Sequence, residues 1–359
     1  MTAPLSHLAR CLPEPRLSGV LKSTPDDFCV EEVLGFSPEG SGSHGLFWIE
    51  KIGTTTPQMI GRISRLARVA ERDIGFCGLK DKHAVTRQWI SLPLGTNEPD
   101  WFDALPEGVR VLDWARHPKK LRRGIHRGNR FTITLRGISG EDPDFSSRLE
   151  RLATTGFANY FAEQRFGTDA RNLDLLARLG ATIESGRVGR SDRNWGISTL
   201  RALIFNEVLS RRIQADTVAA AQEGDLAQLA GSNSRFLVTA DEVDHAQARI
   251  HQRDIRLTGP LWGAGTVPTE AAVRSLETAL ADEVLRQFSA EGDTTIWSNH
   301  LSAWRVDHDR RALMAPLMEP VASFEEGSEG EVSLRLSFTL ASGSYATAVL
   351  RELVQVVPA

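Results

Sequence analysis

The sequence has few cysteines, and their spacing excludes two classes of stabilised protein. Only Cys11, Cys29 and Cys77 occur in 359 residues. None of them forms a Cys-x-x-Cys pair, so neither a disulfide framework nor a zinc site is indicated. Such sparse cysteine usage is typical of a reducing compartment, and we therefore expect a cytoplasmic protein.

Long apolar runs are also missing. No stretch approaches the roughly 18 apolar residues of a membrane-spanning helix, and the first ten residues lack the basic-then-apolar order of a signal peptide. We therefore expect neither membrane insertion nor secretion. The sequence also contains no P-loop, no dinucleotide-binding glycine pattern and no metal-spaced carboxylate pair, which argues against a phosphate-handling enzyme.

The remaining composition is that of an ordinary soluble protein. Hydrophobic residues make up 41% of the chain and charged residues 25%, both close to the average of globular proteins. A chain of 359 residues is long enough for two domains and a sizeable core. No internal repeat is evident.

Positive charge is concentrated in one segment, although the net charge of the whole chain is −4. Between Arg110 and Arg136 there are nine basic residues and a single acid, Asp113, so this segment carries a charge of +8. Glycines and histidines interrupt the charges, which favours a loop shaped around a ligand over a solvated helix face. A basic stripe on an acidic chain predicts a binding site for phosphate groups.

The most informative residue is an acid in a basic setting. Asp81 lies between Lys80 and Lys82, and His83 follows. Nearby positive charge keeps a carboxylate ionised. An ionised carboxylate on a basic surface would meet a polyanion where it docks, so the pattern indicates an enzyme that acts on nucleic acid. The alternative is an aspartate that only makes a local turn hydrogen bond.

Alternation and helical spacing predict mixed strands and helices in the first 155 residues. The pair Thr56-Pro57 is typical of a helix N-cap followed by a first-turn proline, and apolar residues follow at helical spacing. In the segment 130–136, Phe131, Ile133 and Leu135 alternate with polar residues, so one sheet face should be buried. The expected strands are 28–32, 46–49, 88–92, 109–114 and 130–136.

Helical periodicity dominates the middle of the chain. Helices are expected over 173–179, 199–212, 241–253 and 269–290. Strand alternation returns in 332–340, and a turn at Gly343 precedes a short helix at 346–353. We therefore predict an α+β fold with a discontinuous core, residues 1–155 and 316–359, and a helix-rich domain of residues 156–315 inserted between its halves.

The pattern around Asp81, G-x-K-D-x-x-A-x-T-x-Q, resembles the signature of the tRNA pseudouridine-13 synthase family, the D-type pseudouridine synthases. It has six fixed positions in eleven residues: Gly78, Lys80, Asp81, Ala84, Thr86 and Gln88. Further matches extend this resemblance over nearly the whole chain. The resemblance implies an antiparallel-sheet pseudouridine synthase catalytic core, a helix-rich α/β insertion and an RNA-binding cleft between them.

The resemblance also implies a reaction. Asp81 would act on a target uridine, whose glycosidic bond breaks before the rotated uracil rejoins the sugar through C5. The aspartate would serve as nucleophile or as base, and both roles need its ionised form. No cofactor and no metal are expected, and tRNA, modified at uridine 13, is the implied partner.

Two further elements carry candidate substrate-binding residues. Gly128-Asn129-Arg130-Phe131 resembles the family's G-N-x-F element, and Lys22 with Phe28 resembles its N-terminal K-x-x-P-x-D-F-x-V-x-E element. Asn129 could bind the uracil edge or a sugar hydroxyl, or simply occupy a turn, and Phe131 could stack on a base or pack in the core. Lys22 could pair with Asp81 or contact phosphate, and Phe28 could contact the base or pack in the core.

Tyr345 lies in a third such element, where the family usually has phenylalanine, and a proline that the family shows a few residues earlier is Ala341 here. An aromatic face for stacking is kept, whereas the added hydroxyl needs a partner if it is buried. Lys80 completes the candidate substrate-binding residues. The residues expected on the RNA backbone are Lys119, Lys120, Arg122, Arg123 and Arg127.

Residues 159–167 resemble the family motif N-Y-F-x-x-Q-R-F-G. Its aromatic density and Arg165 could stabilise packing or contact RNA. A catalytically silent tRNA-binding protein, an RNA chaperone on the same fold, is the alternative function. The intact Asp81, Lys80 and Asn129 argue against it. We expect a monomer without a protein partner.

Overall fold

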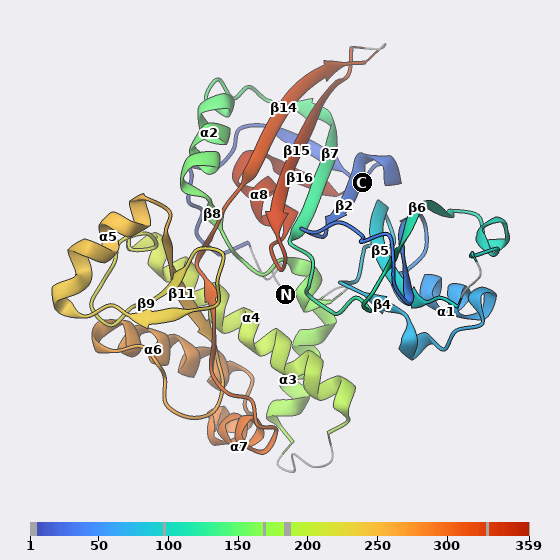
Figure 1. Ribbon diagram of the computed structural model, residues 1–359. Helices are drawn as coiled ribbons and strands as arrows, with labels where there is room; N and C mark the ends of the chain where they lie inside the picture. Colours follow the sequence, from blue (N-terminus) through green and yellow to red (C-terminus); the bar gives the residue numbers. More distant parts are fainter. Residues whose placement is uncertain (1–5, 96–97, 168–169, 183–187, 328–329, 359) are drawn as a thin grey trace. The chain divides into compact units, whose positions relative to one another are not determined.

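The computed structural model describes residues 6–95, 98–167, 170–182, 188–327 and 330–358 (Figure 1). The chain divides into two compact units. The first, which we call the sheet unit, comprises Pro15–Thr155, Pro316–Ala346 and Leu353–Ala359. The second, the helical unit, comprises Met1–Glu14, Gly156–Ala315 and Thr347–Glu352. The interpretation of residues 156–315 as an inserted functional domain stays a prediction.

One large sheet organises the sheet unit. Its main path has the order β14-β15-β7-β2-β5-β3-β6, with β1 paired to β7 and β16, and β4 paired to β5. Only the β1–β16 and β2–β5 ladders are parallel among the described pairs. The strands are β1 (Ser18–Leu21), β2 (Phe28–Val33), β3 (His44–Lys51), β4 (Gly75–Phe76), β5 (Val85–Pro93), β6 (Val109–His117), β7 (Gly128–Ser139), β14 (Met318–Glu326), β15 (Val332–Ala341) and β16 (Gln355–Pro358).

The predicted alternation of β7 is confirmed. Phe131, Ile133 and Leu135 are at most 7% exposed. Phe131 lies opposite Phe338 of β15, and Ile133 lies opposite Leu336, so the apolar positions of both strands meet on one face of the sheet. This mixture of an antiparallel-rich sheet with helices confirms the predicted α+β fold class.

Helix α1 (Thr56–Ala67) packs its apolar side against the sheet unit's core. Met59, Ile60 and Ile63 are buried in a cluster that includes Phe47 and Ile90. The predicted N-cap was wrong by one position, as defined by the capping hydrogen bond. Thr55, not Thr56, caps the helix, because its side chain accepts a hydrogen bond from the Gln58 backbone N–H. The second helix lying wholly within this unit is α2 (Phe145–Thr155).

The helical unit contains all four of the predicted central helices. Helix α4 contacts α3, α6 and the strand β11 (Figure 1). Two small sheets accompany the helices: β10-β9-β11-β12, and the pair β8–β13. The elements are α3 (Arg171–Gly180), α4 (Arg190–Gln214), α5 (Val243–His251), α6 (Ala271–Gln287), α7 (Thr295–Ala303), β8 (Phe157–Ala158), β9 (Leu226–Leu229), β10 (Arg235–Leu237), β11 (Ile255–Leu261), β12 (Asp309–Ala312) and β13 (Met314–Ala315). Helix α8 (Ala346–Leu353) has the predicted bounds.

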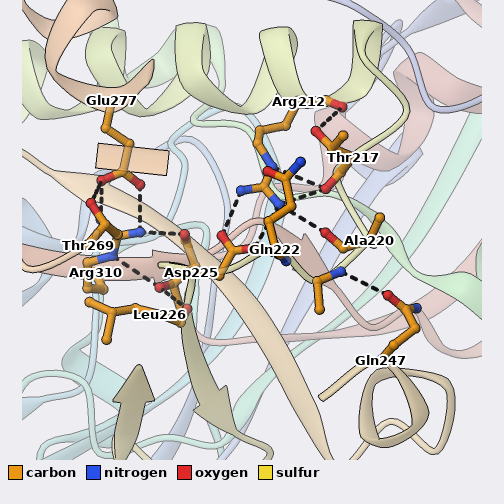
Figure 2. Close-up of polar contacts among 12 residues, drawn as sticks. Arg212, Thr217, Ala220, Gln222, Asp225, Leu226, Gln247, Thr269, Glu277 and Arg310 are labelled. Atoms are coloured by element: carbon orange, nitrogen blue, oxygen red, sulfur yellow. Dashed lines mark hydrogen bonds and ion pairs between the residues drawn. The ribbon is translucent and has the colours of Figure 1, made fainter. Parts of the chain in front are cut away.

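Two buried ion pairs fix the elements of the helical unit, as Figure 2 shows. Arg212 of α4 contacts Asp225 at 2.7 Å, and Arg310 of β12 contacts Glu277 of α6 at 2.7 Å. All four side chains are at most 2% exposed. Buried charges need partners of this quality, since an unpaired charge in the interior is strongly destabilising.

No helix in the described part of the chain combines the length and the apolar composition that crossing a bilayer requires. Cys29 and Cys77 are free thiols, and Cys77 is buried.

Candidate functional site

Asp81 lies in the loop between β4 and β5 of the sheet unit, with its side chain 33% exposed. Lys22 Nζ donates a hydrogen bond to its Oδ2, and the backbone N–H of His83 donates to Oδ1 at 3.1 Å. Burial alone would raise the pKa of Asp81, but the hydrogen bond and charge of Lys22 outweigh burial and hold this pKa below its ordinary value. Asp81 is therefore ionised at neutral pH.

Lys22 is held in an unusual backbone conformation directly after β1. Its φ is +62°, in the left-handed region that residues other than glycine rarely adopt. Its Nζ also lies 4.3 Å from the ring centroid of Phe28, within the range of a cation–π contact. Of the two partners considered for Lys22, the structure shows Asp81. Strained backbone of this kind is found preferentially at functional sites.

A buried lysine anchors the backbone of the Asp81 loop. Lys51, at the end of β3, is 0% exposed, and its Nζ donates to the carbonyl oxygens of Asp81 at 2.6 Å and Thr54 at 2.9 Å. Burial lowers the pKa of Lys51 to about 8, although the charge of Asp81 opposes this shift. The sequence analysis missed Lys51, because nothing in an apolar strand marks its last lysine as a partner of a distant loop.

The side chains of Thr56 and Gln88 hold the same loop from the other side. The Thr56 hydroxyl accepts a hydrogen bond from the backbone N–H of Lys80 at 3.0 Å and donates to Gln88 Oε1 at 2.9 Å. Gln88 Nε2 in turn donates to the Gly78 carbonyl at 3.5 Å. Gln88, the last fixed position of the motif, thus has a structural function. The hydroxyl of Thr56 binds this loop and does not cap helix α1.

Lys80 connects two residues of neighbouring strands. Its Nζ donates to Glu32 Oε2 at 2.9 Å and to Asn129 Oδ1 at 2.8 Å. Because an ammonium group can only donate, the amide of Asn129 must turn its oxygen to Lys80, which leaves its Nδ2 as the donor end. Glu32, which the sequence analysis did not select, is buried and also accepts from the Trp89 backbone N–H. The sequence did carry a signal for Glu32, because it is the final acid of the motif element that begins at Lys22.

Two of the candidate aromatic residues, Phe28 and Phe131, form a row with Phe338 in the sheet. The ring centroids of Phe28 and Phe131 lie 6.1 Å apart, and those of Phe131 and Phe338 lie 5.6 Å apart. Phe28 is 4% exposed and Phe131 is 7% exposed, so both pack in the core as the structure stands. Tyr345, directly before α8, is half-buried. A contact of any of these rings with a base stays a prediction.

The predicted RNA-backbone residues all lie in the loop 118–127 between β6 and β7. Other basic residues of the stripe have carboxylate partners: Arg110 pairs with Glu50, Arg130 with Glu319, and Arg136 with Asp27. Among the described ion pairs, none involves the five loop residues. Lys120 donates to a backbone carbonyl, and Arg123 lies over an aromatic ring at 4.0 Å. Within the stripe, the cations without a carboxylate partner among the described ion pairs are therefore concentrated in this loop.

The segment 159–167 lies in the helical unit, where it makes structural hydrogen bonds. Asn159 Nδ2 donates to the Ala312 carbonyl at 2.9 Å, and Arg165 donates to the Ser198 hydroxyl at 2.7 Å. The rings of Phe161 and Phe205 are 5.5 Å apart. These contacts join β8, α4 and β12 within one unit, which favours the packing interpretation of this motif.

Glu32, Cys77 and His126 form a buried cluster whose potential ligand atoms all lie within 4.8 Å of one another. A divalent cation fits this cluster poorly. The Lys80 ammonium group already occupies one side of Glu32, and burial raises the pKa of the Cys77 thiol, which therefore stays protonated. The arrangement is better explained as hydrogen-bonded support beneath Lys80.

Taken as chemistry, the site offers a partly exposed carboxylate with a fixed ammonium partner and an oriented amide nearby. Such a carboxylate can attack an electrophilic sugar carbon or remove a proton from one. The oriented amide can donate to a carbonyl oxygen of a heterocycle. Both groups are supported by buried hydrogen bonds, and this is the preorganisation that catalysis requires.

Comparison with known proteins adds an independent finding. The model of the family described as tRNA pseudouridine synthase D (TruD) matches residues 8–179 and 195–353. A tRNA pseudouridine synthase D from Chromohalobacter salexigens is 41% identical over 95% of this chain and 94% of its own length. One from Methylococcus capsulatus is 37% identical over 98% and 95%, respectively.

A solved structure shows the same fold. It is the crystal structure of a protein described as a putative tRNA pseudouridine synthase D from Methanosarcina mazei, which superposes with a TM-score of 0.73. The two sequences are 22% identical, and the match covers 96% of this chain and 95% of the other.

Proposed function

The chain belongs to the tRNA pseudouridine synthase D family, and on that premise we propose that it converts uridine 13 of tRNA to pseudouridine with Asp81 as the essential carboxylate. Membership makes it a tRNA pseudouridine synthase, an isomerase. The finer proposal concerns the position in tRNA and the residue that reacts.

The observation that supports Asp81 is its ionised and oriented state. Lys22 contacts one carboxylate oxygen, and the His83 N–H contacts the other, so the pKa of Asp81 lies below its ordinary value. Lys51 holds the backbone of the same residue. Attack on the sugar and proton removal from it both need a carboxylate that is charged at neutral pH.

The resemblance of the segment 78–88 to the pseudouridine-13 signature supports position 13. The proposed reaction breaks the glycosidic C–N bond, keeps the uracil bound, and joins uracil C5 to the sugar. The hydrogen on C5 leaves as a proton, N1 takes up a proton in its place, and no oxidant or reductant is consumed. Asn129, with its oxygen held by Lys80, would donate from Nδ2 to a uracil carbonyl.

The test uses unmodified tRNA transcript carrying tritium at C5 of its uracils. We expect wild-type protein to release tritium to water, and Asp81→Asn to release none while its dissociation constant for tRNA stays unchanged. Asp73→Asn, an exposed aspartate close before the same loop, is the matched control and should behave as wild type. A transcript in which uridine 13 is replaced by cytidine should release no tritium.

Other results would contradict specific parts of the proposal. Tritium release by Asp81→Asn at the wild-type rate would remove Asp81 from the reaction. Release from the cytidine-13 transcript would move the target to another uridine. Tight tRNA binding without release by the wild type would instead favour an RNA-binding role for this protein.

A further inference from the structure

A hollow of the sheet unit has a lining that does not include Asp81. It has a volume of about 670 Å³, within the usual range of ligand pockets. The loop 118–127 forms most of its wall, and Phe36, shortly after β2, and His117, at the end of β6, form the rest. None of the hydrogen bonds described around Asp81, Lys80 and Asn129 involves a residue of this wall.

The pocket presents an aromatic ring that is both exposed and supported. Phe36 is 38% exposed, and its ring stacks on His117 with centroids 5.5 Å apart and an angle of 26° between the planes. Ile125, which is 46% exposed, is a second apolar side chain in the wall. Flat apolar surfaces of this kind bind unstacked nucleobases, at about 1–3 kcal/mol per base, with little dependence on base identity.

The same wall carries three cations and no carboxylate. Lys119, Lys120 and Arg122 line the pocket, and Lys119 and Arg122 are exposed. None of the three has a carboxylate partner among the described ion pairs, unlike Arg110 and Arg136 at the two ends of the stripe. An aromatic ring bordered by uncompensated cations is the combination that recognises a base together with its flanking phosphates.

His117 completes the wall and supports the ring of Phe36. It is 7% exposed and lines the pocket. Its Nδ1 is buried and makes no hydrogen bond to any residue that the structure describes. Buried polar atoms in native proteins almost always have a partner, so we expect an ordered water to satisfy this atom.

The pocket wall is held in place by the sheet. Leu121 is 3% exposed in a cluster with Leu34, Leu46 and Cys77. The Gly124 N–H donates to the Cys77 carbonyl at 2.8 Å, and the Leu121 N–H donates to the Ser91 hydroxyl at 2.8 Å. The site is thus preformed, and it adjoins the chain that leads from Cys77 to Asp81.

We propose that this pocket binds one unpaired nucleotide of the tRNA substrate, distinct from the uridine that reacts, with its base against Phe36 and its phosphates against Lys119 and Arg122. The inference rests on the proposed function, because it takes tRNA as the ligand. A bound nucleotide here would fix the RNA on the sheet unit through the loop 118–127, which leads into β7 and Asn129.

The experiment measures the dissociation constant of the full chain for unmodified tRNA transcript over a range of salt concentrations. Phe36→Ala should weaken binding about 30-fold, in the middle of the range for removal of one stacked base, and should leave the slope of log K against log[salt] unchanged. Phe36→Trp should restore binding. Phe324→Ala removes another exposed phenylalanine of the same unit and should bind as wild type.

The outcomes separate a base from a phosphate in the pocket. Lys119→Glu with Arg122→Glu should flatten the salt slope, because fewer neutralised phosphates release fewer counterions. If Phe36→Ala binds tRNA as wild type and the charge variant has a flattened salt slope, the pocket binds phosphate only. That result would overturn the proposal that it binds a base. Wild-type behaviour of both variants would place the pocket outside the RNA footprint.

Failure of this inference can be distinguished from failure of the proposed function. Asp81→Asn is judged by tritium release, whereas the pocket is judged by tRNA affinity alone. Since Phe36 is exposed, urea unfolding of Phe36→Ala should match wild type, and a lower unfolding midpoint would transfer the test to Phe36→Leu, which keeps the apolar bulk but lacks the flat ring.

Discussion

At the scale of single residues, Lys51 couples the Asp81 loop to pH. Its pKa is lowered from its ordinary value of 10.5 to about 8 by burial. Between these values the unfolded chain binds a proton that the folded protein does not, so the free energy of unfolding rises with pH from about 8 to 10.5. The contribution is fully present above 10.5 and is lost as the pH falls through about 8.

This shift gives a measurable difference. Urea unfolding between pH 8 and 10 measures this difference. The free energy of unfolding of Lys51→Met should rise less steeply with pH than that of wild type, by up to about 1.4 kcal/mol per pH unit. The control Lys119→Met, at an exposed position, should keep the full rise. Equal slopes in wild type and Lys51→Met would show that Lys51 is charged in the folded protein throughout this range.

A second prediction at the scale of single residues concerns Lys80, whose Nζ orients the amide of Asn129. Lys80→Met should lower kcat of tritium release about 100-fold, the cost of misplacing a reacting group by roughly 1 Å, with a small change in tRNA affinity. The exposed neighbour Lys82 is the control, as Lys82→Met. A flattened salt slope of tRNA binding in Lys80→Met would instead assign Lys80 to phosphate binding.

At the scale of secondary-structure elements, the pair Arg310–Glu277 joins β12 to α6 inside the helical unit (Figure 2). Arg310 makes two hydrogen bonds of 2.7 Å with the carboxylate and is buried. Glu277→Gln would leave a buried guanidinium group without a counter-charge, which costs about 3–5 kcal/mol.

Urea unfolding followed by circular dichroism measures this destabilisation. Glu283→Gln changes an exposed glutamate of the same helix, so it controls for helix propensity and net charge, and it should unfold at the wild-type midpoint. An unchanged midpoint in Glu277→Gln would mean that the remaining hydrogen bonds of Arg310 are sufficient to hold β12 on α6.

At the scale of the whole molecule, charge distribution matters more than net charge. The chain carries −4 overall, yet the loop 118–127 holds cations without carboxylate partners among the described ion pairs. Lys119→Glu with Arg122→Glu should weaken tRNA binding at physiological salt. It should also reduce the salt slope by about 0.7 for each phosphate of a single-stranded region that is no longer neutralised. Undiminished affinity would remove these two residues from the RNA footprint.

The control for that prediction is Arg151→Glu on α2. Arg151 is exposed and lies in the same unit, so it changes net charge without altering the loop. Equal weakening by Arg151→Glu and by one loop substitution would show that total charge, not the position of the stripe, governs binding.

Local patterns predicted the elements well where one face of an element is buried. The alternation in β7 and β15 identified both strands, and the periodicity around Leu175 and Leu200 identified α3 and α4, because burial imposes these periods directly. The strands β9 to β12 were not predicted individually. They are three to seven residues long, and periodicity cannot distinguish strands of this length from loops or helices.

The sequence by itself determined the fold class, the family and the residues of the Asp81 segment, since each depends on residue types at short, fixed spacings. Only the tertiary structure decided what supports that segment. Lys51, Thr56 and Glu32 come from different elements, and they meet Asp81 and Lys80 because the sheet brings β2 and β3 beside the loop before β5. Hydrogen bonds between distant segments have no period in the sequence, so their partners become visible only when the chain has folded.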